Sequence, residues 1–304
     1  MDKSSMRLTQ IFINPKNDDA PSEIALSSAH PTTSKLRKKV PLATDTGLAT
    51  SRHPGAVSPG GLLKTWPGSP WERYRKVLKW HDLGGDVLLA VSSKERVNIR
   101  VFSEQQAEKS LFWFRQIRHS SFVTALEAFT TNKLLYIVLE EMKITLSHVI
   151  TCSKYPDRQE LGAILGQILD GVVYLEKEGI EHALGWNNVL FNLSGEAKIT
   201  NQECCQTATR ESRSRTVSRI AHITMGLMNK DDKPVGVQRS QWLSCPEAIA
   251  FAAATTSARS ATELLEHPFL TMYGREETDW DKGSLLGLIS LADTEADREY
   301  HYEE

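Results

Sequence analysis

The chain has 304 residues, of which 40% are hydrophobic and 24% charged, enough for one large two-lobed domain or two small ones with tails. The formal net charge of −2 provides no global field for nucleic acid or an anionic membrane, so we expect neither as a partner. No run of 18 apolar residues occurs and the N-terminus lacks an apolar signal core, which indicates an intracellular protein, cytoplasmic or nuclear.

Residues 1–70 are rich in Ser, Thr, Pro, Gly and Lys and show no sustained apolar period, so we predict a disordered arm. The basic run KLRKK at 35–39 is typical of a nuclear-import or anion-binding signal, but also of any disordered arm. The four cysteines show no spacing of a zinc site and are expected to be small buried hydrophobes.

After this arm, short apolar and β-branched runs separated by turn residues predict strands at 73–80, 86–93, 96–103, 122–131 and 133–142. Apolar residues at helical spacing predict helices at 104–119, 158–179, 217–228, 245–257 and 261–270, the last ending at Pro268. The segment 188–200 reads as a small hairpin, and Gly179 as the C-cap of the helix before it.

Strands followed by helices indicate an α+β architecture. We predict an arm at 1–70, a strand-rich lobe at 71–142, a helical lobe at 143–271 and an acidic tail at 272–304. The tail contains the apolar run SLLGLISL at 284–291, which either packs back on the body or docks a partner.

Five local signatures, in this order along the chain, resemble the eukaryotic protein kinase fold. They are VNIRVF at 97–102, HSSFV at 119–123, LYIVLEEM at 135–142, NVLFNLSGEAKIT at 188–200 and ELLEHPFL at 263–270. The resemblance covers about residues 72–271 and is most similar to the degenerate kinase-like chains expanded in filamentous fungi. It implies a bilobal fold, with a small five-stranded antiparallel N-lobe containing one helix and a shortened helical C-lobe.

Phosphoryl transfer in this family needs a glycine loop over the phosphates, a Lys–Glu pair, a proton acceptor and oxygen ligands for magnesium. Alignment on Val87 places the three loop glycines at Trp80, Asp82 and Gly85, and only Gly85 matches. Trp80 is bulky and Asp82 would repel phosphate, so the sequence favours a plain hairpin turn at Gly84-Gly85.

The resemblance places Arg100 at the lysine position and Ser110 at the position of the partner glutamate. Glu108 lies two residues away, on a different face of the helix. Asn98 replaces the small alanine that roofs the adenine, where an amide would intrude on the ring or remain unsatisfied. Both members of the Lys–Glu pair are therefore lost.

In the catalytic loop, Asn188 matches the family asparagine, but the proton-accepting aspartate falls on Ala183, or on Leu184 in a register with one deletion. Glu181 is the nearest carboxylate and lies too early in the loop to reach a substrate hydroxyl. His182 is more typical of a satisfied structural histidine than of a base.

The magnesium triplet reads Asn201-Gln202-Glu203. Magnesium is a hard cation that is usually held by carboxylates and phosphates, and the neutral Asn201 would ligate it only weakly. Glu203 occupies the place of a glycine that allows the turn. We therefore predict no metal site.

Only about 14 residues, 204–217, join the triplet to the helix that resembles the central C-lobe helix, too few for a full activation segment. Val217 lies near the place of the aspartate that normally starts that helix. Pro246-Glu247 reads as the first turn of a late helix rather than as the end of an activation segment. The linker contains Arg210, Arg213, Arg215 and Arg219, and either binds an acidic or phosphorylated partner, is phosphorylated at Ser212 or Ser214, or is a solvated loop.

The leading hypothesis is a pseudokinase: a kinase-shaped binding or scaffold module for protein partners, without catalytic residues. The degenerate catalytic positions are Arg100, Ser110, Ala183 and Asn201. The alternative is a residual kinase with weak Ser/Thr phosphotransferase activity, and an intermediate case binds ATP weakly without turnover. The remnant ATP pocket would comprise Gly85, Val87, Arg100, Leu139 (at the gatekeeper position), Glu140, Met142 and Asn188. A third hypothesis is a decaying or mispredicted gene product without a stable fold.

Overall fold

A computed structural model describes residues 63–230, 240–276, 279–298 and 300–302. The chain divides into the units Met1–Gly55 and Ala56–Glu304, and every described residue belongs to the second unit. The arm predicted at 1–70 therefore lies outside the described residues up to position 62. Its boundary was placed too late, because Leu63 is buried and strand β1, Lys64–Pro67, already belongs to the fold.

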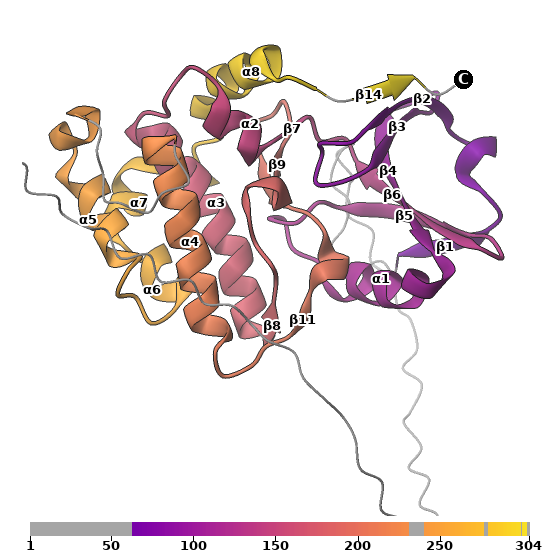
Figure 1. Ribbon diagram of the computed structural model, residues 1–304, viewed down its shortest axis with the longest axis horizontal. Helices are drawn as coiled ribbons and strands as arrows, with labels where there is room; N and C mark the ends of the chain where they lie inside the picture. The colour runs from indigo at the N-terminus through magenta and orange to yellow at the C-terminus, as the bar shows by residue number, and fades with distance from the viewer. Residues whose placement is uncertain (1–62, 231–239, 277–278, 299, 303–304) are drawn as a thin grey trace, which may run out of the picture. The chain divides into compact units, whose positions relative to one another are not determined.

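Seven strands of the described chain form the largest sheet, in the order β1-β5-β6-β4-β3-β2-β14 (Figure 1). Its further strands are β2 Arg75–Trp80, β3 Val87–Val91, β4 Arg96–Ser103, β5 Ala125–Thr130, β6 Leu134–Glu140 and β14 Tyr300–Tyr302. The five predicted strands are the middle of this sheet and pair antiparallel. The predicted number of five strands was too low, because β1 pairs in parallel with one edge strand, β5, and β14 pairs antiparallel with the other, β2.

Alternation along β6 shows how the sheet buries both faces. Leu135, Ile137 and Leu139 belong to one apolar cluster, while Tyr136 and Val138 between them belong to another. This is the two-residue period of a strand, and it makes the run almost continuously apolar because both faces are covered.

Helix α1, Glu104–Gln116, follows β4 in the chain and covers one face of the sheet at β4 and β6. Ser103 and Gln106 form a capping box at its start, and the predicted apolar positions Phe114 and Ile117 are buried. Phe114 lies 6.1 Å from Phe102 of β4 between ring centroids, which fixes the helix against the sheet. We call residues 63–142 the sheet half.

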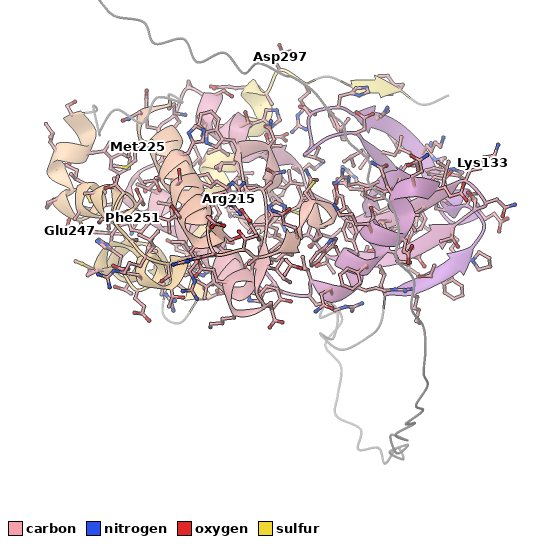
Figure 2. All side chains as sticks on the ribbon, turned by 60° about the horizontal axis from the view of Figure 1, so that its bottom comes forward. Lys133, Arg215, Met225, Glu247, Phe251 and Asp297 are labelled. Carbon is pink, nitrogen blue, oxygen red and sulfur yellow. The ribbon has the colours of Figure 1, made fainter. Side chains whose placement is uncertain are left out.

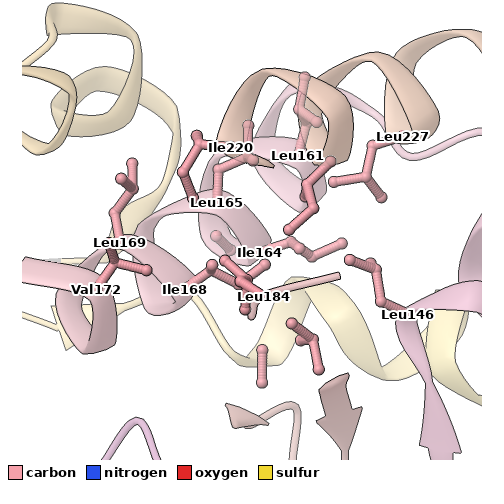
Figure 3. Packing of buried hydrophobic residues seen from close by; sticks show 14 of the residues in the cluster. Leu146, Leu161, Ile164, Leu165, Ile168, Leu169, Val172, Leu184, Ile220 and Leu227 are labelled. Carbon is pink, nitrogen blue, oxygen red and sulfur yellow. The ribbon is translucent and has the colours of Figure 1, made fainter. Parts of the chain in front are cut away.

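The helical half, residues 143–295, is built around α3, Arg158–Lys177. The predicted apolar face of this helix, from Leu161 to Val172, is buried against the neighbouring helices (Figure 3). Asp157 caps the N-terminus through the backbone N–H groups of Gln159 and Glu160. Gly179, with φ of +67°, follows the end of the helix in the left-handed conformation, as the C-cap prediction required.

The other helices of the described chain are shorter or surround α3. They are α2 Leu146–Thr151, α4 Ser212–Asn229, α5 Pro246–Ala254, α6 Ala261–Leu265, α7 Pro268–Tyr273 and α8 Leu286–Glu295. Short 3-10 turns are η1 Pro70–Glu72, η2 Trp186–Asn188, η3 Gln202–Cys204, η4 Ser240–Ser244 and η5 Gly283–Leu285. In the described parts, no helix is both long and apolar enough to cross a membrane.

Small strand pairs connect these helices. One small sheet has three strands, in which β9 Val189–Phe191 lies between β7 Ile144–Thr145 and β10 Ala197–Ile199. Two further sheets have two strands each: β8 Ile180–Glu181 with β11 Gln206–Thr207, and β12 Arg275–Glu276 with β13 Asp279–Trp280. The pair β9–β10 is the hairpin predicted at 188–200.

Two predictions about the end of the chain are corrected or decided here. The helix predicted at 261–270 is two helices, because Pro268 starts α7 at its first turn, where a missing N–H costs nothing. The apolar run at 284–291 packs back on the body, with Leu288 and Ile289 of α8 buried in the core of the helical half. Its alternative role, docking a partner, is therefore not open to these side chains.

Candidate functional site

The turn between β2 and β3 packs directly on the segment that resembles the kinase catalytic centre. Gly84 and Gly85 have φ of +74° and +113°, so the turn requires residues without a side chain. A Cβ on Gly84 would lie 2.9 Å from Cγ2 of Thr200, which shows how close the approach is. The Nδ2 group of Asn201 donates to the carbonyl oxygen of Gly84 at 2.9 Å. The predicted hairpin turn is present, and it is docked rather than free.

Leu83 in this turn is buried in the same apolar cluster as three residues that the sequence assigned to a remnant nucleotide pocket. It is 1% exposed and packs in one cluster with Val87, Leu139, Met142 and Leu190. Three of these, Val87, Leu139 and Met142, are predicted pocket residues, and all three are buried. Val87, Leu139 and Met142 are therefore buried in the same apolar cluster as Leu83, and the cluster does not include the other predicted pocket residues Gly85, Arg100, Glu140 and Asn188.

Asn98 occupies the hinge. Its Nδ2 group donates to the carbonyl oxygen of Met142 at 3.1 Å, and the side chain is buried. The backbone N–H of Glu140 donates to the carbonyl of Thr124 at 3.0 Å. The prediction that this amide would remain unsatisfied was half right, since its buried Oδ1 has no hydrogen-bond partner while Nδ2 does. Two backbone groups of the segment 140–142, the Met142 carbonyl and the Glu140 N–H, thus make hydrogen bonds within the protein.

Arg100 makes its charge contacts with the triplet at 201–203. Its Nη1 donates to Oδ1 of Asn201 and lies 2.7 Å from Oε1 of Glu203. Asn201 has φ of +64°, a left-handed conformation that asparagine tolerates better than most residues. Glu203 thereby serves as the partner of Arg100, while Ser110 on α1 is buried and Glu108 is exposed. Sequence reasoning did not pair Arg100 with Glu203 directly. It gave Glu203 the place of a glycine and, for the alternative of a residual kinase, grouped it with Arg100, Asn188 and Asn201 around a nucleotide.

This polar cluster does not fit a magnesium ion. Both ends of the Asn201 amide are engaged, Oδ1 by Arg100 and Nδ2 by the Gly84 carbonyl. The Arg100 guanidinium also pairs with Oε1 of Glu203, so the carboxylate of the triplet already has a cationic partner, and a second cation beside it would be repelled. Among the described residues, no group of three or more His, Cys, Asp or Glu side chains could hold a metal.

The four cysteines were expected to be buried. Cys152, Cys205 and Cys245 are buried, whereas Cys204 is exposed, so the expectation was wrong for Cys204.

The loop at 180–188 places its polar residues as follows. Ala183 is exposed and Leu184 is buried, so neither register of the alignment supplies a carboxylate. Asn188 is half-buried, and its backbone carbonyl accepts from the N–H of Thr200 at 2.9 Å. The imidazole of His182 is buried, and its Nε2 donates to the carbonyl of Asn201 at 3.2 Å. Burial lowers the pKa of His182 to about 4, which keeps the ring neutral.

Glu181 is the centre of an ion-pair cluster that attaches α4 to this loop. Its carboxylate accepts from Nε and Nη2 of Arg215, the first at 2.8 Å, and from Nη1 of Arg219 at 3.1 Å. The hydroxyl of Ser212 donates to it at 2.6 Å. The hydrogen bonds from Arg215 are the main reason that the pKa of Glu181 lies well below its usual range. Figure 2 labels Arg215 on α4.

This cluster changes the interpretation of the arginine-rich linker. Helix α4 starts at Ser212, so part of the predicted linker is helical and only 204–211 precede it. Arg215 and Arg219 both pair with the single carboxylate of Glu181, and Ser212 is buried. Arg210, Arg213 and Ser214 are exposed. Pro246 and Glu247 lie in the first turn of α5, as predicted.

Comparisons with known proteins agree with the resemblance. Residues 77–223 match the family model of the protein kinase domain. A curated relative is the serine/threonine-protein kinase shk1/pak1 of Schizosaccharomyces pombe, 27% identical over 161 residues, which are 49% of this chain and 24% of the relative. The match thus spans about a quarter of that relative's length. The chain contains a protein kinase-like domain.

Proposed function

We propose that the chain is a catalytically inactive member of the kinase-like proteins, a pseudokinase that acts as a binding or scaffold module for protein partners. The observation that supports this most is the cluster of Arg100, Asn201 and Glu203. In this cluster Arg100 donates to Asn201 and pairs with Glu203, at the place where a phosphotransferase would hold a metal–triphosphate. Ala183 in the catalytic loop offers no proton acceptor, and the carboxylate of Glu181 is consumed by arginines.

The same proposal treats nucleotide as a ligand that the protein does not need. A nucleotide entering the remnant pocket of Gly85, Val87, Arg100, Leu139, Glu140, Met142 and Asn188 would have to displace Leu83 and the Asn98 amide. It would also have to break the bonds that Arg100 and Asn201 make. Each displaced buried group costs about 1–3 kcal/mol, which weakens binding by one to two orders of magnitude per group.

The test of the proposal is phosphate transfer by the full chain. Labelled ATP with magnesium or manganese is incubated with the chain alone and with generic protein substrates, and an active Ser/Thr kinase is the positive control. We expect incorporation equal to the buffer blank. Incorporation that follows the folded protein through its purification would overturn the proposal.

A thermal-shift titration separates the alternative, a residual nucleotide-binding kinase with weak Ser/Thr activity. A ligand at 100 times its dissociation constant stabilises a protein by about 2.7 kcal/mol, a rise in Tm of several degrees. We expect no rise at millimolar ATP–magnesium. A rise in the wild-type chain that is lost on substitution of Arg100 by alanine would favour the alternative.

A further inference from the structure

The last described residues of the chain connect the helical half to the sheet half. Helix α8 is held on the helical half by its buried residues Leu288, Ile289 and Ala292. At its end, the carboxylate of Glu295 accepts from both the backbone N–H and the hydroxyl of Ser153, each at 2.6 Å. The position of α8 is therefore fixed by packing and by hydrogen bonds.

Beyond α8 the chain reaches the edge of the sheet. β14 pairs antiparallel with β2, with Tyr300 opposite Trp80 and Tyr302 opposite Leu78 (Figure 1). Figure 2 labels Asp297 in the connection between α8 and β14. Because β2 leads directly into the turn at 81–86, a strand added to β2 restrains the start of that turn.

Arg298 adds a side-chain contact at the same place. Its guanidinium lies 4.6 Å from the centroid of the Trp80 ring, its Nη2 pairs with Asp293 of α8, and its side chain is only 11% exposed. Trp80 stands where the resemblance expects the first glycine of a phosphate loop. The same large Trp80 ring that disfavours phosphate binding thus forms a cation–π contact with Arg298.

The turn itself has two further contacts with the helical half. Oδ2 of Asp82 lies 3.1 Å from Nε2 of His148 on α2. The Nδ1 atom of His148 accepts the N–H of Thr145, so its Nε2 carries the ring hydrogen; Nε2 and the Asp82 carboxylate are in close contact but not in hydrogen-bond geometry. With the bond from Asn201 to Gly84, contacts at positions 80, 82 and 84 attach the turn to residues outside the sheet half.

We propose that α8, Arg298 and β14 form an intramolecular strap that holds the turn at 81–86 closed on the helical half without a ligand. Removal of the strap takes away the pairing of β14 with β2 and the contact of the Arg298 guanidinium with the Trp80 ring. The turn then keeps the contacts of Asp82 and Gly84 and the packing of Leu83, but loses those of the strap, and opens more often. The strap affects the conformation of the turn, so the test of the strap is independent of the test of phosphate transfer.

Hydrogen exchange measured by mass spectrometry tests the strap. Two variants remove it in different ways: a chain that ends at Arg298, which lacks β14, and the full-length Arg298→Ala chain. We expect amides in 75–91 to exchange about tenfold faster in the shortened chain, since each lost backbone hydrogen bond contributes on the order of 1 kcal/mol. A smaller acceleration in the same segment is expected for Arg298→Ala.

Two matched controls define the result. A chain that ends at Tyr302 keeps β14, and Arg213→Ala removes an exposed arginine of α4; both should exchange like the wild type. Amides of α3 at 161–173 should be unchanged in every variant. Unaltered exchange at 75–91 in the shortened chain would overturn the proposal, as would an equal acceleration throughout the chain. If the shortened chain does not fold, Arg298→Ala alone decides, because an unchanged 75–91 segment contradicts the strap.

Discussion

The burial of Leu83 is the clearest sign that the turn between β2 and β3 is packed against the core rather than open to solvent. Leu83 is 1% exposed although it lies in a turn between two strands, whereas Leu193, in the turn between β9 and β10, is 58% exposed. We expect Leu83→Ala to lower the free energy of unfolding by about 2–4 kcal/mol, as for a buried leucine in a core. Leu193→Ala should change it by less than about 0.5 kcal/mol. Urea denaturation of the two variants measures the difference.

Equal, small losses for both leucines would contradict the closed turn. In that case Leu83 would be exposed for much of the time, and the cluster with Val87 and Met142 would not be a permanent part of the core. The turn would then behave as a flexible flap, and the remnant pocket would be accessible to a ligand.

For single residues, the sequence shows which catalytic side chains of the family are absent, but not which side chains make new contacts in their place. The absence of carboxylates at Ala183 and Asn201 and of a glutamate at Ser110 could be read from alignment with the family pattern alone. The partner that Arg100 acquired could not, because the side chain of Glu203 reaches it only through the left-handed turn at Asn201. Such a contact depends on the backbone of one residue, which no period or spacing encodes.

The ion-pair cluster around Glu181 determines how α4 begins. The helix has no side-chain cap at Glu211, and its first turns are instead held by the bonds that Ser212, Arg215 and Arg219 make to Glu181. Glu181→Gln removes the negative charge but keeps the size. We expect a loss of about 2–4 kcal/mol in the free energy of unfolding, since a buried partner of several donors is replaced by a neutral one.

Glu211→Gln is the matched control, because this glutamate is exposed at the start of the same helix. Its effect should lie within about 0.5 kcal/mol. Faster hydrogen exchange at 212–219 in Glu181→Gln, and not in the control, would locate the loss at the helix start. Identical exchange in both variants would mean that α4 is held by its apolar face alone.

Long elements were predicted well and short ones were not. Helix α3 was recognised from its apolar period, and its cap at Gly179 from glycine's tolerance of positive φ. Helix α2 and strands β1 and β14 were missed because they are too short to show a period. The sequence predicted that a helix ends at Pro268, but not that a second helix starts there. Proline disrupts the interior of a helix and is also favoured in its first turn, and the sequence alone does not distinguish these two effects.

For the whole molecule, the sheet and helical halves are joined by contacts between residues distant in sequence. The backbone groups of Ser121 and Val123 bond to Ile199 on both sides, and Lys198 bonds to both carboxylate oxygens of Glu140 at 2.8 Å. Gln202 donates to the carbonyl of Val123 at 2.8 Å. None of these contacts requires a nucleotide or a metal, and together they make one folded unit of the kinase-like domain.

The acid stability of this unit follows from its buried histidines. Burial lowers the pKa of His182 to about 4 and also lowers the pKa of His119 and His267. The ordinary histidine value is 6.5, so below that pH the unfolded chain binds protons that the folded chain excludes. Stability is therefore complete above about pH 6.5 and falls as the pH is lowered toward 4. From His182 alone we expect a loss of about 2 kcal/mol between pH 7 and pH 5.

Urea denaturation of the wild type and of His182→Gln at a series of pH values measures this loss. Glutamine does not titrate, so the variant should lose less stability than the wild type over the same interval, whatever its absolute stability at pH 7. The remaining slope belongs to His119 and His267, since the carboxylates with lowered pKa, such as Glu181, contribute only below about pH 4.5. Parallel curves would show that His182 titrates with its ordinary pKa in the folded state, and then its Nε2 bond to the Asn201 carbonyl would become a charged contact as the pH falls below about 6.5.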